Sequence, residues 1–149
     1  MHTAMGYTPD IVMAGLSLWI RKRTHLNSNN YWDGNWLDIS ACATAPGARV
    51  EIAGALLCSS DIARFLAQLE TLYRDLSGTA KLGDDEPTIM AEMACDRLGH
   101  IKLTVNITPD LVTQAHRFYF DLDQSHLPAI MADCQRAMER FPIKGSPHA

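Results

Sequence analysis

The chain has 149 residues, a formal net charge of −4 at pH 7 and a sequence pI of about 5.8. This length is enough for one domain with a sizeable core, and the acidic balance argues against broad nucleic-acid affinity, which needs a basic face. No apolar run approaches the roughly 20 residues of a membrane span, and the first ten residues lack the pattern of a signal peptide. We therefore expect a cytoplasmic protein with no membrane partner.

The N-terminal third predicts three strands. Residues 11–23 form one nearly continuous apolar run that ends in a basic triplet at 21–23, which predicts a single long strand. The triplet is either a solvated strand end or a patch for an acidic partner. Residues 37–44 and 49–58 alternate in polarity and predict a hairpin that turns at Pro46-Gly47.

Three aromatic side chains crowd one short stretch before this hairpin. Tyr31, Trp32 and Trp36 flank the pair Asp33-Gly34, which is a strong turn signal. Two interpretations stay open. The aromatic side chains either pin a turn to the sheet, or they form an exposed anchor surface, because Trp and Tyr are favoured at protein interfaces.

A strand followed by a helix occurs twice. The strand at 49–58 precedes a helix over 61–76, and a strand at 117–122 precedes a helix that begins near residue 127 and stops at Pro142. Serines precede both helices and offer N-caps: Ser59 and Ser60 for the first, Ser125 for the second. One interpretation is a degenerate internal duplication. The other is that such caps recur for physical reasons alone.

The region between the two units predicts three further strands. A short strand over 80–82 leads to an acidic loop that contains Asp84, Asp85 and Glu86. This loop is either a solvated turn or an electrostatic contact for a basic partner. Strands are expected at 89–95 and 100–108, where apolar and polar residues alternate cleanly.

Together these patterns predict an α+β fold. We expect a single antiparallel sheet of about six or seven strands, with two amphipathic helices packed on one face. Since no linker divides the chain, residues 1–149 should form one domain, with residues 1–10 and 142–149 as peripheral tails.

Signatures of catalysis are absent from the sequence. It contains no phosphate-binding glycine loop, nucleophile elbow or paired metal-binding histidines, and its four scattered cysteines read as reduced apolar residues. We therefore predict a protein that is not an enzyme and has no catalytic residue, cofactor or metal. Asp121 and Asp123 face the same side of a strand and could serve a small hydrolase. The alternative for them is a solvated polar face, with Asp123 helping to cap the next helix.

Several motifs occur together in a fixed order. They are Trp32-Asp33-Gly34-Asn35-Trp36-Leu37, the helix 65–76 ending in Leu76-Ser77-Gly78, Leu98-Gly99-His100-Ile101, and Phe120-Asp121-Leu122-Asp123-Gln124-Ser125-His126-Leu127-Pro128-Ala129-Ile130 closing at Phe141-Pro142. In this order and spacing they resemble the WapI-type immunity family, from about residue 10 to residue 143. These small bacterial proteins are associated with polymorphic, contact-dependent toxin systems.

The resemblance implies that the protein binds the C-terminal toxin domain of a cognate partner and neutralises it. The type member of the family opposes a toxin that cleaves transfer RNA, so a nuclease toxin is expected. The resemblance implies no cofactor, no catalytic residue and no direct nucleic-acid contact. Residue types alone suggest the partner-binding side chains, which are Tyr31, Trp32, Asp33, Trp36, Asp84, Asp85 and Glu86. A non-catalytic structural module, such as a homodimer joined through a sheet edge, is the alternative, and the small hydrolase is the third reading.

Overall fold

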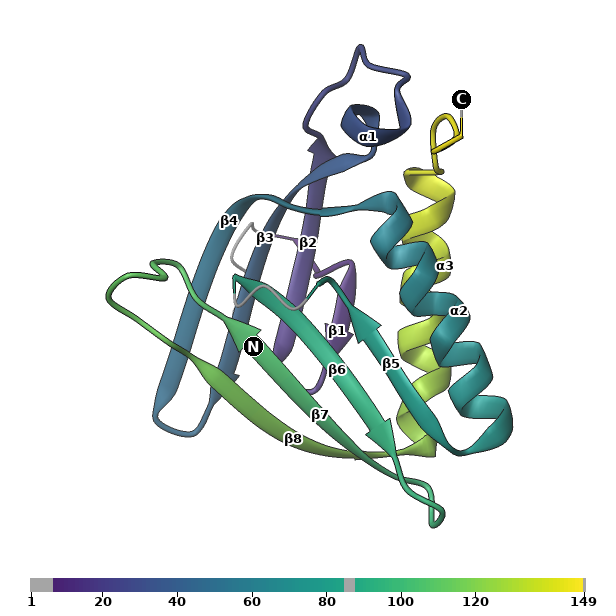
Figure 1. Ribbon diagram of the computed structural model, residues 1–149. Coiled ribbons are helices and arrows are strands. Elements are labelled where there is room, and N and C mark those ends of the chain that lie inside the picture. Colours follow the sequence, from purple (N-terminus) through teal and green to yellow (C-terminus); the bar gives the residue numbers. More distant parts are fainter. Residues whose placement is uncertain (1–6, 85–87, 149) are drawn as a thin grey trace.

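The computed structural model describes residues 7–84 and 88–148, which form two four-stranded antiparallel sheets (Figure 1). The first sheet, in the order β1-β2-β3-β4, comprises β1 (Ile11–Met13), β2 (Leu16–Arg23), β3 (Trp36–Ala45) and β4 (Ala48–Cys58). The second, in the order β5-β6-β7-β8, comprises β5 (Gly78–Leu82), β6 (Ile89–Cys95), β7 (His100–Ile107) and β8 (Arg117–Asp123). Within each sheet, the strands therefore pair in the order of the sequence.

The described chain also forms three α-helices: α1 (Tyr31–Gly34), α2 (Ser59–Asp75) and α3 (Leu127–Arg140). Helices α2 and α3 run side by side along one flank of the molecule (Figure 1). Helix α2 follows the first sheet but contacts β5 of the second, whereas α3 follows the second sheet but contacts β1 of the first. The chain is thus two repeats of four strands and a helix, each helix covering the other repeat's edge strand. This repeated topology favours an internal duplication.

The α+β class is confirmed, but the single sheet with both helices on one face is wrong. The chain leaves the first sheet through α2 and starts a second sheet, and β4 contacts β7 across the interior. Two smaller sheets that share a core can bury an apolar face each, together with the apolar stripes of both helices. Alternation within a strand gives its buried face but not its sheet, which is why the sequence did not reveal the division.

The prediction of one strand over residues 11–23 is also wrong. The chain reverses at Ala14 and Gly15, so that β1 and β2 pair as a hairpin with Met13 opposite Leu16. Ala14 has a φ of 51°, a left-handed conformation that is uncommon for a residue with a side chain. The apolar run continues through the turn because both strands are buried, and it therefore conceals the turn.

The cap expected at the first strand-to-helix joint is not a serine. The N-cap of α2 is Cys58, and its N–H donates to the Asp61 carboxylate at 2.8 Å. Ser59 is instead the first residue of α2, and its buried hydroxyl has no hydrogen-bond partner within the described chain. The helix begins earlier than the serine pattern indicates because a carboxylate in its first turn satisfies the cap N–H.

The second joint is closed by Asp123. Its carboxylate accepts from the N–H of Ser125 at 2.8 Å and from the Ser125 hydroxyl, which closes a 3₁₀ turn over Gln124–His126 before α3 begins. Asp123 therefore caps this 3₁₀ turn and not α3 itself, whose N-cap is His126, and Ser125 is not the N-cap either. Pro128 lies in the first turn of α3, where its missing backbone N–H costs least.

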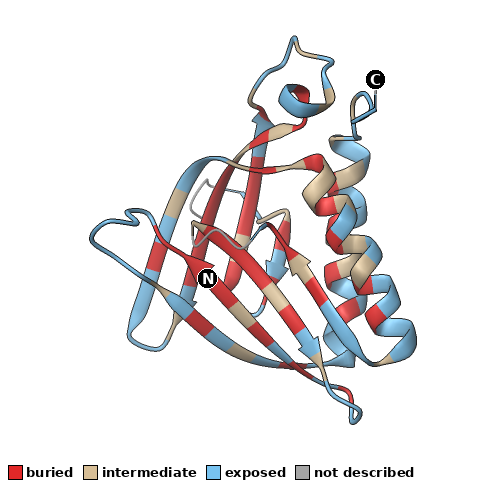
Figure 2. Ribbon diagram, viewed as in Figure 1, coloured by how far each residue is buried: buried red, intermediate tan, exposed pale blue. Residues whose placement is uncertain are grey.

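One apolar cluster joins both sheets to α2 and α3. Its largest fully buried side chains include Phe65, Ile11, Met13, Leu16 and Leu69. The four cysteines are free thiols, as expected; two are buried and two are half-buried. In Figure 2 the buried residues are concentrated on the strands and on α2 and α3, while the connection that holds α1 is largely exposed.

Candidate functional site

The connection between β2 and β3 forms a prominence at one end of the molecule (Figure 1). Asn30 caps α1 here: its side-chain oxygen accepts from the N–H of Trp32 at 2.7 Å, and its carbonyl accepts from the N–H of Gly34 at 2.7 Å. Asp33-Gly34 therefore ends a single helical turn instead of forming a hairpin turn. These two bonds satisfy backbone N–H groups of the turn and hold its backbone in the helical conformation.

The aromatic residues of this turn divide between anchoring and exposure. Trp32 is 64% exposed, Tyr31 is half-buried, and their rings meet edge to face with centroids 5.0 Å apart. Asp33 is exposed beside them. The two sequence interpretations thus apply to different side chains, since Tyr31 packs against the molecule and Trp32 faces solvent.

Two buried polar residues hold the turn from below. The Arg23 guanidinium donates to the carbonyl of Gly34 at 2.9 Å, and the Asn35 side-chain amide donates to the carbonyl of Tyr31 at 2.8 Å. Both residues are less than a tenth exposed, so each of these bonds lies in a region of low dielectric, where losing a partner is costly. The turn is therefore anchored by side chains that approach it from the protein interior.

Sequence reasoning missed both anchors. Both interpretations of the basic triplet at 21–23, a solvated strand end or a patch for an acidic partner, treat its three residues alike. In the structure Arg21 and Lys22 are exposed, but Arg23 is buried. A register shift between Ile20 and Lys22 moves Arg23 onto the buried side of β2. Strict alternation would have turned it outward, and the sequence carries no signal of this bulge.

Trp36 and Asp84 come together at a second feature, a groove beside the first strand-to-helix joint. The groove has a volume of about 440 Å³. Its described lining includes Trp36, Leu56, Leu57, Asp61 and Asp84. Trp36 is half-buried and Asp84 is exposed. An aromatic wall with an exposed carboxylate at its edge suits a cationic side chain. Asp85 and Glu86, the other predicted residues of the acidic loop, lie outside the described residues.

Cys58 lies at the joint beside this groove. Burial, followed by the charges of Asp61 and Asp84, raises the pKa of its thiol to about 11. The thiol is therefore protonated at neutral pH, and in this form it is a poor nucleophile.

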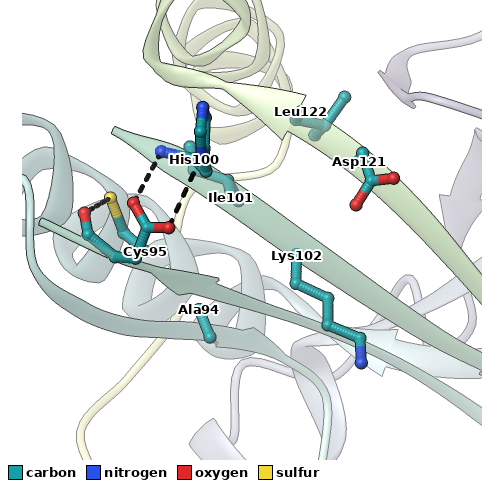
Figure 3. Close-up of a pocket in the computed structure, with 8 residues that line it drawn as sticks. Ala94, Cys95, His100, Ile101, Lys102, Asp121 and Leu122 are labelled. Carbon is teal, nitrogen blue, oxygen red and sulfur yellow. Dashed lines mark hydrogen bonds and ion pairs between the residues drawn. The ribbon is translucent and has the colours of Figure 1, made fainter. Parts of the chain in front are cut away.

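Asp121 and Asp123, the carboxylates considered for a hydrolase, have different surroundings. Asp121 lines an opening of about 560 Å³ at the β6–β7 hairpin together with His100 and Lys102 (Figure 3). Asp123 instead closes the turn before α3, and its hydrogen bonds from Ser125 hold the pKa of its carboxyl below the usual range. A general acid needs a raised pKa, whereas the pKa of Asp123 is lowered.

Among the described residues, no group of three or more His, Cys, Asp or Glu side chains is placed to hold a metal ion. In the same part of the chain, no helix combines the length and the apolar character needed to cross a membrane.

The features that stand out are thus an anchored, exposed aromatic turn and an open groove, as in a protein that presents a binding surface. A model of the immunity protein WapI-like family matches residues 11–142, and the chain belongs to this family. No curated protein sequence matches it.

The solved structures that match the chain include the following two. The CdiA-CT/CdiI toxin and immunity complex from Enterobacter cloacae matches with 8% identity and a TM-score of 0.41, covering 68% of this chain and 89% of the other. The plant transcriptional regulator PBF-2 matches with 9% identity and a TM-score of 0.44, covering 90% of this chain and 83% of the other.

Proposed function

We propose that this protein neutralises a cognate toxin domain by binding it stoichiometrically in the cytoplasm, without catalysis or a cofactor. Family membership across residues 11–142 supports the immunity role. The observation that carries the choice of surface is the exposed Trp32 ring on a turn whose backbone is anchored by Arg23 and Asn35. A rigid exposed tryptophan loses little conformational freedom on binding and can bury a large apolar area.

The contact surface proposed here consists of Tyr31, Trp32, Asp33 and Trp36, with Asp84, Asp85 and Glu86 of the acidic loop. A nuclease toxin requires a basic surface for its nucleic acid. Exposed carboxylates such as Asp33 and Asp84, on a chain of net charge −4, complement such a surface and speed association. The immunity protein then inhibits the toxin by occupying the surface that the nucleic acid needs.

Paired expression tests the function. The toxin domain encoded beside this chain is expressed with and without it, and surviving cells are counted. Survival that depends on this chain, together with a one-to-one complex by calorimetry, is the expected result. A toxin domain that kills equally in both cases, or that forms no complex, would count against the proposal.

Trp32→Ala tests the surface, with Leu98→Ala as the matched control. Leu98 is 81% exposed on the β6–β7 hairpin, far from α1 (Figure 1). We expect Trp32→Ala to weaken toxin binding by about 2 kcal/mol or more while changing the free energy of unfolding by less than about 0.5 kcal/mol. Leu98→Ala should change neither quantity. If Trp32→Ala unfolds the protein, or binds as tightly as the wild type, the assigned surface is wrong.

A homodimer is the second candidate, and strand β4 favours it. Its central residues Ala53, Gly54 and Ala55 are exposed, and it is an edge strand whose outer backbone groups can pair with another strand. Sedimentation at several concentrations tests this proposal. If the protein is a monomer at every concentration, the homodimer proposal is wrong. If a dimer persists when the toxin domain is bound, the protein has separate surfaces for the second copy and for the toxin.

A further inference from the structure

The C-terminal segment 142–145 is joined to α1 by a reciprocal pair of hydrogen bonds. The N–H of Lys144 donates to the Asn35 side-chain oxygen at 2.8 Å, and the Asn35 amide donates back to the Lys144 carbonyl at 3.0 Å. The same amide donates to Tyr31, as described above. One fully buried side chain therefore bonds two segments that lie 109 positions apart in the sequence.

Further contacts fix this segment in place. The Lys144 ammonium donates to the carbonyls of Leu26 at 3.3 Å and Ser28 at 3.1 Å. Gly145 has a φ of 67°, and a Cβ there would lie 3.0 Å from both the carbonyl oxygen of Asn29 and the N–H nitrogen of Tyr31. Such a close approach of two backbones requires glycine.

Arg23 holds the other end of the same segment. Its guanidinium donates to the carbonyl of Pro142 as well as to Gly34, and it lies over the Phe141 ring at 5.9 Å from the centroid. Residues that follow the last helix thus take part in the buried polar network under α1. A disordered tail would use none of these donors and acceptors.

Apolar side chains project from the segments that this network joins. Leu26 and Trp32 are each 64% exposed, and Ile143 is 43% exposed. Figure 1 shows the C-terminal end of the chain beside α1. Asp33 and His25 are exposed within the same connection. An apolar centre with a polar margin is the usual composition of a protein–protein interface.

We propose that the C-terminal segment forms part of the toxin-binding surface, with Ile143 completing an apolar patch begun by Leu26 and Trp32. Lys144 and Asn35 act as positioning residues that fix the patch and touch no partner themselves. The occupant is the toxin domain, through an apolar pocket whose margin carries basic residues that meet Asp33. This inference rests on the function proposed above.

Three variants test it against the purified toxin domain by calorimetry. Ile143→Asp should weaken binding by about tenfold or more, because it places a charge in the apolar centre of the interface. A chain ending at Pro142 should bind at least as weakly, whereas one ending at Gly145 keeps the whole network and should bind like the wild type. Leu98→Asp, an equally drastic change on the opposite hairpin, should have no effect.

Hydrogen exchange of the free proteins separates positioning from contact. The amides of residues 26–35 should exchange faster in the chain that ends at Pro142 and at the wild-type rate in Ile143→Asp. If Ile143→Asp and the chain ending at Pro142 both bind as tightly as the wild type, the inference is overturned and the proposed function stands. If the wild-type chain itself does not bind the toxin domain, both fail. Should the shorter chain unfold, Ile143→Asp alone decides.

Discussion

The two repeats connect their second and third strands in different ways. In the second repeat, residues 96–99 form a hairpin that closes on itself: the Asp96 carboxylate accepts from the N–H groups of Leu98 at 2.8 Å and His100 at 3.0 Å. In the first repeat the equivalent connection is residues 24–35, and it includes α1. Its anchors, Arg23 and Asn35, connect it to the other end of the chain.

The two connections therefore differ in whether their hydrogen-bond partners come from within the connection or from distant parts of the chain. The short hairpin needs only its own aspartate, whereas the long connection is ordered by groups from β2 and from the C-terminal segment. Ordering a longer connection costs conformational entropy, and such extensions on a rigid scaffold are where binding residues concentrate. The repeat that departs from the simple hairpin is therefore the one we assign to the partner.

The largest effect is expected at the first turn of the first repeat. A Cβ on Gly15 would lie 2.1 Å from the carbonyl oxygen of Thr44 and 2.8 Å from the Phe120 ring. Gly15→Ala should therefore cost about 3 kcal/mol of stability, measured by urea denaturation. Gly47→Ala is the control: its Cβ meets nothing within 4 Å, so only the φ of 79° matters, at about 1 kcal/mol. Equal losses would show that the close approach at Gly15 relaxes freely.

The next effect compares the two connections directly. Asn35→Ala removes the partner of the Lys144 N–H and of the carbonyls of Tyr31 and Lys144, all in a buried region. We expect a loss of about 2 kcal/mol in the free energy of unfolding. Asp96→Ala should cost less, because the amides it releases are exposed to water. If Asp96→Ala lowers the free energy of unfolding more than Asn35→Ala does, the proposed difference between the two connections is wrong.

A smaller effect, with the opposite sign, is expected at the first strand-to-helix joint. The Ser59 hydroxyl is buried with no partner within the described residues, so Ser59→Ala should stabilise the protein by about 1 kcal/mol. In the second repeat, Ser125→Ala removes a hydroxyl that donates to Asp123 and should destabilise. Thermal unfolding of both variants gives the two signs. Destabilisation by Ser59→Ala would indicate that its hydroxyl is bound in solution.

The smallest effect expected is a loss of stability in the second repeat at acidic pH. Asp96, Asp110 and Asp123 all close connections in the second repeat, and hydrogen bonds lower the pKa of each carboxyl below its ordinary 3.8. The main donors are the Leu98 N–H for Asp96, the Thr113 hydroxyl for Asp110 and the Ser125 hydroxyl for Asp123. Because folding lowers these pKa values, their stabilisation is present above pH 3.8 and is lost as the pH falls through the folded values.

The loss of stabilisation by these aspartates can be measured as amide hydrogen exchange, corrected for intrinsic rates, between about pH 5 and about pH 3. Residues 96–99 and 110–113 should lose protection on acidification. The connection 24–35 should keep more of its protection, because its anchors are an amide, a guanidinium and backbone groups. Equal loss in both connections would remove the contrast between the repeats.

The sequence placed part of the candidate site. The sequence predicts a turn at Asp33-Gly34 and leaves an exposed aromatic surface as one of two interpretations, whereas the helical form of that turn and its Asn30 cap are seen only in the structure. The partition between an exposed Trp32 and a half-buried Tyr31 could not be foreseen, because each ring's surroundings come from distant segments. The pairing of Trp36 with Asp84 in one groove likewise depends on how β3 and the end of β5 meet. The binding role of these residues stays a prediction.

By itself the sequence determined the local elements. Alternation specified β7 and β8, helical periodicity specified α2 and α3, and Pro46-Gly47 specified the β3–β4 turn, because each pattern acts between near neighbours in the chain. Only the tertiary structure decided the division into two sheets, the burial of Arg23 at a bulge, and the bonds between Asn35 and Lys144. Each of these depends on which distant segments bury one another's surface and satisfy one another's polar groups, and no periodicity within a segment encodes that choice.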